Sequence, residues 1–167
     1  MDMNTDMTLE SAERCRAYLH QLVDQYYDRL VQSIKTGEPL PAQNDVLPLS
    51  ADSAQFKGRK PMAVIFPDGR RVDVSKWKAV AVVILQECVG TPLYGERLMA
   101  IRGKVMGRDR MILAASPDGM NVPLEIIPEL FMEGKFDTES LLYVLTKRIL
   151  EPVGYSYHNI KIELRGQ

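Results

Sequence analysis

Apolar residues recur every three or four positions from Leu9 to Ile34, with no proline or glycine among them. This spacing puts them on one face of an α-helix, so the pattern predicts a single long helix over residues 8–36. Thr8 is the expected N-cap, and Gly37 is expected to end the helix. Such a helix is a rod of roughly 40 Å, and its wide apolar stripe has to be covered.

Three kinds of surface can cover this stripe: the rest of the chain, a second copy of the chain, or a helix of another protein. A compact domain of about 100 residues has a radius of gyration near ~13 Å, so a ~40 Å rod is long for it to cover. Packing on the chain's own domain remains an alternative, beside a homo-oligomer or a partner protein bound through residues 8–36. The residues predicted to carry that contact are Leu19, Leu22, Tyr26 and Leu30.

Residues 38–60 hold three prolines, of which Pro39 is a second stop signal for the helix, and many small polar residues. This composition is typical of a linker or an extended arm. Part of the arm can still dock through its apolar residues Val46, Leu47 and Leu49. The predicted division is an N-terminal helix over 1–37, an arm over 38–60 and a compact domain over 61–167.

The compact domain begins with a hairpin and a helix. Residues 62–66 and 70–74 are rich in β-formers, and the Pro-Asp-Gly turn at 67–69 joins them, with glycine in the left-handed conformation. Ser75 is the expected cap of a helix that Gly90 closes.

The rest of the domain repeats this alternation of strands and helices. Residues 91–101 are ambiguous and include a possible short helix. A second Pro-Asp-Gly turn stands at 117–119, and Pro152 is the expected stop of the last helix. The further expected elements are strands at 111–115, 122–126 and 130–132, a helix from Asp137 or Thr138 to Leu150, and a last strand at 160–164. The resulting order, α-ββ-α-βββ-α-β, predicts an α+β fold with helices packed on a mostly antiparallel sheet.

Other features of the chain bear on its location. No apolar run has the length of a membrane span, and the acidic start MDMNTDMTLE is unlike a secretory signal. We therefore expect no membrane contact and a cytoplasmic location. Cys15 and Cys88 both fall in helical patterns, which favours two buried reduced thiols over a disulfide or a reactive thiol.

No pattern in the chain predicts catalysis. His20 and His158 are far apart in the sequence, which favours exposed or structural histidines over a metal site, and no glycine-rich loop of the phosphate-binding kind is present. Asp68 and Asp118 are the residues that tight turns prefer. We therefore expect no enzyme activity, no catalytic residue, no metal and no cofactor.

The distribution of charge is the remaining signal. Residues 57–110 contain twelve basic and five acidic residues, a net charge of +7, between segments of −5 and −3. Lysine and arginine neutralise phosphates, and glycines let backbone amides approach an anion. An ordinary solvated surface remains the alternative. The predicted nucleic-acid contacts are Lys57, Arg59, Lys60, Arg70, Arg71, Lys76, Lys78, Arg102, Lys104, Arg108 and Arg110.

Residues 61–165 also carry an outline of motifs: the strand-turn-strand "PMAVIFPDGRRVDV", a Trp-containing helix, "PLEII", "GKF", a helix, "GY" and a closing strand. In this outline the chain resembles a small accessory module of bacterial and mobile-element proteins, of the kind appended to restriction-type DNA-targeting proteins. The resemblance implies a DNA-associated helper role without catalytic residues. The sequence thus predicts a non-enzymatic accessory module that binds DNA or RNA, or alternatively an assembly subunit that uses its long helix.

Overall fold

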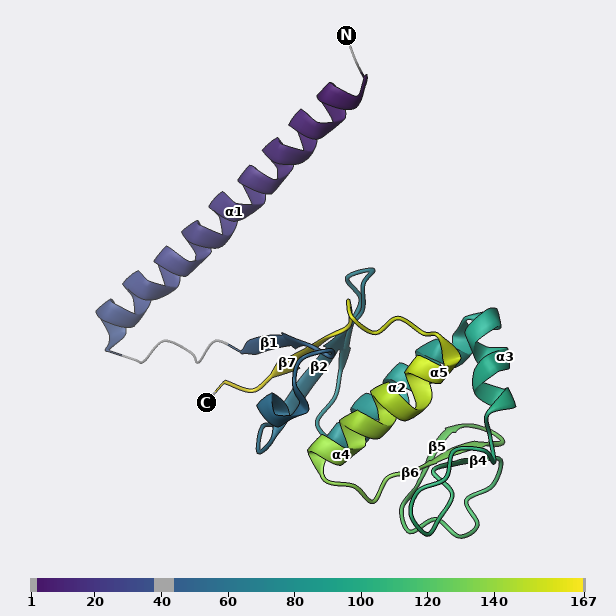
Figure 1. Ribbon diagram of the computed structural model, residues 1–167. Helices are drawn as coiled ribbons and strands as arrows, with labels where there is room; N and C mark the ends of the chain where they lie inside the picture. Colours follow the sequence, from purple (N-terminus) through teal and green to yellow (C-terminus); the bar gives the residue numbers. More distant parts are fainter. Residues whose placement is uncertain (1–2, 38–43, 167) are drawn as a thin grey trace. The chain divides into compact units, whose positions relative to one another are not determined.

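The computed structural model describes residues 3–37 and 44–166, and the chain divides into two units, Met1–Ala42 and Gln43–Gln167. Of the described residues, those of the first unit form helix α1 and end at Gly37, and those of the second form the strands and the other helices (Figure 1). Each unit is described by itself.

Helix α1 (Met3–Thr36) is unbroken, as the apolar spacing predicts. It begins before Thr8, which lies inside the helix and is not its N-cap, because nothing in the preceding residues interrupts a helix. Gly37 has a φ of 69°, and its N–H donates to the Ser33 carbonyl at 2.9 Å. The predicted glycine ending is therefore confirmed, whereas Pro39 lies outside the described residues.

The compact unit contains a four-stranded antiparallel sheet. Its strand order is β1 (Asp45–Pro48), β7 (Lys161–Leu164), β2 (Pro61–Ile65) and β3 (Arg71–Asp73). The β2–β3 hairpin has the predicted turn: Gly69 has a φ of 87° and its N–H donates to the Phe66 carbonyl at 2.9 Å. The first and last segments of the unit thus lie side by side in one sheet (Figure 1).

The predicted arm over 38–60 needs correction, because the described part of it, 44–60, belongs to the compact unit. Strand β1 is hydrogen-bonded to β7, with Leu47 opposite Ile162. A short 3-10 helix, η1 (Ser53–Phe56), then carries Phe56 into the core. This proline-containing stretch has a weak local preference for regular structure. Strand pairing and the burial of Leu49 and Phe56 nevertheless stabilise it as part of the compact unit.

A second antiparallel sheet has three strands in the order β4 (Leu113–Ala114), β6 (Leu130–Glu133) and β5 (Pro123–Ile127). The predicted α+β class and antiparallel pairing are confirmed, but the strands form two sheets where one was expected. The predicted strand over 111–115 is reduced to two residues. Met111 instead forms an isolated bridge with Met106, which starts a separate hairpin.

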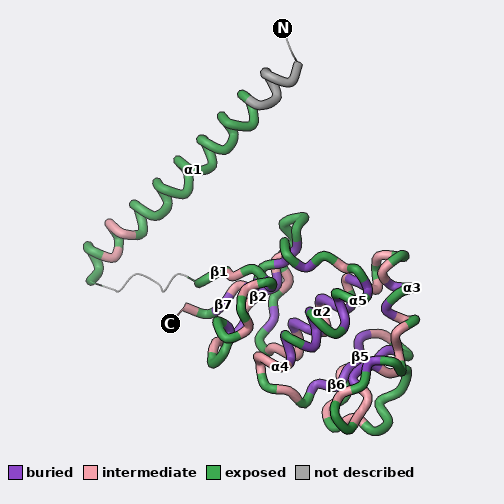
Figure 2. The backbone as a smooth tube through the Cα atoms, in the orientation of Figure 1, coloured by how far each residue is buried: buried purple, intermediate pink, exposed green. Residues whose placement is uncertain are grey.

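Helix α2 (Trp77–Gly90) is the centre of the compact unit. It packs against β2 of the first sheet, β5 of the second, and helix α4 (Thr138–Tyr143). Val80, Ile84, Leu85 and Cys88 of α2 are almost fully buried. The buried residues of the compact unit concentrate on this helix and its neighbours (Figure 2).

Both ends of α2 differ from the prediction: the helix begins one residue later than expected, and Gly90 does not end it through a left-handed conformation. Ser75 is not the cap: the Val74 N–H donates to the Met62 carbonyl, which keeps the chain extended, and the cap position falls at Lys76 without a side-chain bond. Gly90 is the last helical residue but does not have a positive φ. The helix ends at Thr91 because the next residue, Pro92, favours an extended conformation before it.

Pro92 also begins helix α3 (Pro92–Ala100), which resolves the ambiguous residues 91–101 as a helix. The last helix starts at α4 with Asp137 as N-cap, as expected, and the Asp137 carboxylate accepts from the Ser140 N–H at 2.8 Å. It continues as a π-helical stretch over 144–150 and as α5 (Glu151–Val153). Pro152 is therefore inside the helical run and not its stop. The run ends at Gly154, which has a φ of 79°.

The two cysteines differ from each other. Cys88 is buried as predicted, and burial raises the pKa of its thiol to about 11. Cys15 is exposed on α1, so the expectation of two buried thiols is wrong for it. Within residues 3–37 and 44–166, none of the helices has both the length and the apolar content that crossing a membrane requires.

Candidate interaction surfaces

Ion pairs neutralise part of the predicted basic surface: five of its eleven residues pair with carboxylates. Arg70 binds Glu87 of α2 at 2.7 Å and Asp68 at 3.6 Å, and its guanidinium lies 4.7 Å from the ring centre of Phe66. The hydrogen bond to Glu87 raises the pKa of Arg70. Lys57 pairs with Glu139 at 3.2 Å, and Arg59 pairs with Asp45.

Arg71 is held on the outer face of the four-stranded sheet. Its Nε donates to Glu163 at 2.8 Å, and it also pairs with Asp73 on its own strand. Glu163 lies on β7 and Arg71 on β3, so the pair spans β2, where Ala63 is opposite both Asp73 and Glu163 and is fully buried. The Arg71 hydrogen bond lowers the pKa of Glu163. A phosphate would have to compete with this carboxylate for Arg71.

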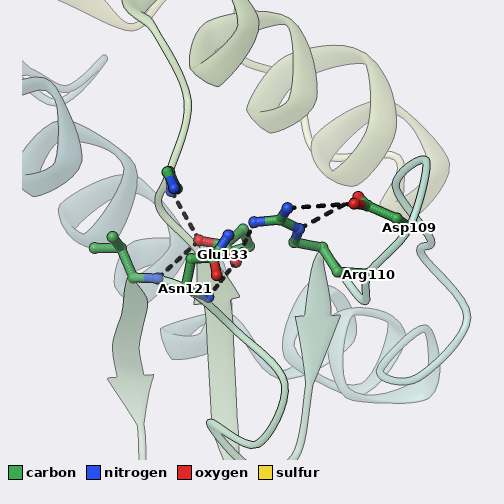
Figure 3. Close-up of polar contacts among 6 residues, drawn as sticks. Asp109, Arg110, Asn121 and Glu133 are labelled. Atoms are coloured by element: carbon green, nitrogen blue, oxygen red, sulfur yellow. Dashed lines mark hydrogen bonds and ion pairs between the residues drawn. The ribbon is translucent and has the colours of Figure 1, made fainter.

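Arg110 takes part in a cluster around Glu133 of β6 (Figure 3). The Glu133 carboxylate accepts backbone N–H bonds from Asn121 at 2.7 Å, Lys135 at 2.8 Å and Val122 at 3.0 Å, and Arg110 approaches it to 3.7 Å. Burial raises the pKa of Glu133, but these three bonds and the arginine charge outweigh burial, so the pKa is lowered overall. The arrangement fixes the loop between β4 and β5 and leaves Arg110 directed at protein.

The remaining predicted contacts fall into two separate groups. Arg102 donates to the carbonyls of Glu129 at 2.6 Å and Met99 at 3.1 Å, and Lys104 and Arg108 follow in the hairpin that leads to β4. The other group, at the first sheet and the start of α2, is Lys60, Lys76 and Lys78. Of the predicted contacts, Lys60, Lys76, Lys78, Lys104 and Arg108 make no ion pair or side-chain hydrogen bond among the described residues.

A groove of about 430 Å³ lies where β2 begins and β3 ends, lined in part by Lys60, Arg71, Asp73 and Arg165. The Arg165 N–H donates to the Lys60 carbonyl at 2.9 Å, which brings the end of β7 to this groove. Sequence reasoning missed Arg165 because only the β2–β7 pairing places it beside residues a hundred positions earlier. The only feature of the sequence that could have pointed to Arg165 is that it directly follows the alternating apolar residues of the last predicted strand.

The second candidate surface is the apolar stripe of α1. Of the residues predicted for it, Leu19, Leu22 and Tyr26 are exposed by 53%, 43% and 45%, and Leu30 is half-buried. Val23 and Ile34 extend the stripe along the helix, and Figure 2 shows α1 exposed over most of its described length. No other described residue of the helical unit packs over Leu19, Leu22 and Tyr26, which stay exposed.

The compact unit, taken by itself, has no comparable apolar surface. Its large apolar side chains with high exposure, among the described residues, are Val46, Leu93, Met106 and Tyr143. They belong to β1, α3, the hairpin before β4, and α4, respectively. Four side chains on four different elements do not make a continuous stripe, whereas those of α1 recur along one helix.

The described residues hold no group of three His, Cys, Asp or Glu side chains arranged to bind a metal ion. His20 and His158 are both exposed, and the His158 ring stacks on Tyr157 with 4.9 Å between ring centres. Comparison with protein-family models, curated proteins and solved structures finds no match. The resemblance of residues 61–165 to a DNA-associated accessory module therefore stays a prediction.

Proposed function

We propose that the chain is an assembly subunit, in which α1 joins two copies and each compact unit is free to hold a further partner. The observation that carries this proposal is the exposed apolar stripe from Leu9 to Ile34, for which the compact unit offers no matching apolar surface. A surface of this kind marks an interaction site in soluble proteins.

The area of the stripe supports a second copy as the occupant. Seven large apolar side chains on this side of α1 are exposed by 43% to 74%, and Tyr18, which is also exposed, lies away from the stripe. With side-chain areas of ~200 Å², these seven present about 800 Å² on each helix. Two copies would thus bury up to roughly 1,600 Å², which is the size of a stable protein–protein interface.

Leu19→Asp combined with Tyr26→Asp places two charges on the stripe. We expect the wild-type chain to be a dimer in light scattering coupled to size exclusion, and this variant to be a monomer with an unchanged thermal unfolding of the compact unit. Gln25→Asp with Gln32→Asp is the matched control, because it adds the same charges at the same spacing on the polar face and should remain dimeric. A monomeric wild type, or a dimeric stripe variant, would contradict the proposal.

A second candidate function is binding of nucleic acid by the groove beside β2. Its support is the gathering of Lys60, Arg71 and Arg165 around one groove, with Lys76 just beyond Ser75 of its lining. Fluorescence anisotropy with labelled single- and double-stranded DNA at two salt concentrations tests it, since phosphate contacts weaken steeply with salt. We expect Lys60→Ala with Arg165→Ala to reduce binding, and Lys104→Ala with Arg108→Ala to leave it unchanged. Absence of binding at low salt would exclude this function.

A further inference from the structure

Helix α1 carries a seven-residue repeat within its stripe. Positions seven apart lie on nearly the same side of a helix, because seven residues make close to two turns. Two such sets are interleaved at spacings of three and four, as in the a and d positions of a two-stranded coiled coil. The first set is Leu9, Arg16, Val23 and Leu30, and the second is Ala12, Leu19, Tyr26 and Ser33.

A parallel pair in register would place each of these residues against its own copy. Arg16 would then face the partner's Arg16 within an apolar contact, where like charges repel and water is excluded. Ala12 and Ser33 would form two layers of small side chains that leave space unfilled. The sequence of α1 thus disfavours the parallel arrangement at three of its eight layers.

An antiparallel pair places each a position against a d position, and one register matches a large with a small side chain in its outer layers and joins Arg16 to Tyr26 and Leu19 to Val23 in its inner layers. In that register Leu9 faces the partner's Ser33, and Leu30 faces the partner's Ala12. Leu19 packs against the partner's Val23. The opposed helix dipoles add a small favourable contribution.

Arg16 is the residue that decides between the two arrangements. It makes no ion pair or side-chain hydrogen bond among the described residues, although it borders the apolar stripe. In the antiparallel register its guanidinium lies against the ring of the partner's Tyr26, which is a favourable cation–π pairing. We infer that two copies of α1 pair antiparallel in this register, an orientation that rests on the self-association proposed above.

Disulfide trapping distinguishes the orientations. In a Cys15→Ser background, three variants are compared: Leu9→Cys, Ser33→Cys, and both together. In the antiparallel register the two copies of residue 9 are ~36 Å apart along the helix axis, while each lies next to the partner's residue 33. After mild oxidation we expect a cross-linked dimer on a non-reducing gel for the double variant alone. Buried Cys88 is retained in every variant, so it contributes equally to all three.

Cross-linking of the single variants to the same extent as the double variant would establish a parallel pair and overturn the inference. Absence of cross-linking in all three would overturn the register. Light scattering of the reduced variants separates these results from a failure of the proposed function. If the chain is a dimer but cross-links in the parallel pattern, the self-association stands and only the orientation is wrong; if it is a monomer, both fail.

Discussion

Glu133 organises the loop between β4 and β5 from a fully buried position. Its carboxylate accepts three backbone N–H groups, from both sides of the β5–β6 pair, and Arg110 supplies a nearby positive charge. A buried charge with this many donors is stabilising as long as it stays ionised, because each donor would otherwise lack a partner. Its role in this structure is to hold the loop.

Glu133→Gln should lower the free energy of unfolding by roughly 2–4 kcal/mol at neutral pH, because the amide cannot accept all three bonds and turns its own NH₂ toward donors. The pKa of Glu133 is lowered in the folded protein, so the stabilisation is complete above its ordinary value of 4.5 and is lost as the pH falls through the folded pKa.

Urea unfolding at neutral pH and at several values below 4.5 measures this effect. The difference between wild type and variant should narrow toward low pH. Glu125→Gln, at an exposed carboxylate of β5, is the control and should change little. A difference that is independent of pH would contradict the role assigned to the ionised carboxylate.

At the scale of elements, a comparison of Gly90 and Gly95 distinguishes the effect of helix propensity on stability from the effect of packing between helices. Gly95 of α3 approaches α2 so closely that a Cβ on it would lie 2.6 Å from the Val89 carbonyl oxygen, whereas a Cβ on Gly90 would meet nothing within 4 Å. The short connection through Thr91 and Pro92 imposes this contact between α2 and α3. The identity of residue 95 is therefore set by tertiary packing.

Gly95→Ala should destabilise the compact unit by about 1–3 kcal/mol, because backbone has to shift to admit the methyl group. Gly90→Ala should be neutral or stabilising by up to ~1 kcal/mol, because alanine loses less entropy in a helix and no atom obstructs it. Denaturant unfolding of both variants gives the comparison. Equal effects, or stabilisation by Gly95→Ala, would show that the two helices are not in such close contact.

At the scale of the whole molecule, the core is confined to the compact unit. The buried apolar residues extend from Leu49 to Leu164 in the sequence, and none of those described belongs to α1. Both sheets and all the helices that cover them also belong to Gln43–Gln167. The stability of this unit thus depends on its own packing.

Deletion of residues 1–43 should leave a chain that folds with a free energy of unfolding close to that of the compact unit in the full-length protein. It should also be a monomer, because the stripe of α1 is gone. Denaturant unfolding and light scattering test these two outcomes separately. A shortened chain that is unfolded would show that α1 contributes to the core, and one that remains dimeric would place the dimer contact elsewhere.

Local patterns in the sequence were sufficient for most of the secondary structure. Four predicted features depend only on neighbours within a few residues and are therefore predictable from the sequence. They are the apolar spacing of α1, the Pro-Asp-Gly hairpin turn with Gly69, the Asp137 cap and the alternation in β7. The α+β class followed from their order. The side of α1 on which the apolar residues gather was likewise predictable, because their spacing follows the turn of the helix, whereas the binding of a partner there stays a prediction.

Tertiary structure alone decided where charges and strands meet. Residues 57–110 are strongly basic by count, yet Asp45, Glu133, Glu139 and Glu163 come from outside that segment and pair with its cations. Strand β1 exists because β7, more than a hundred residues away, offers it a partner. Ion pairs and strand pairing act through space over a few ångströms, so a net charge summed along the chain does not predict the field at the folded surface.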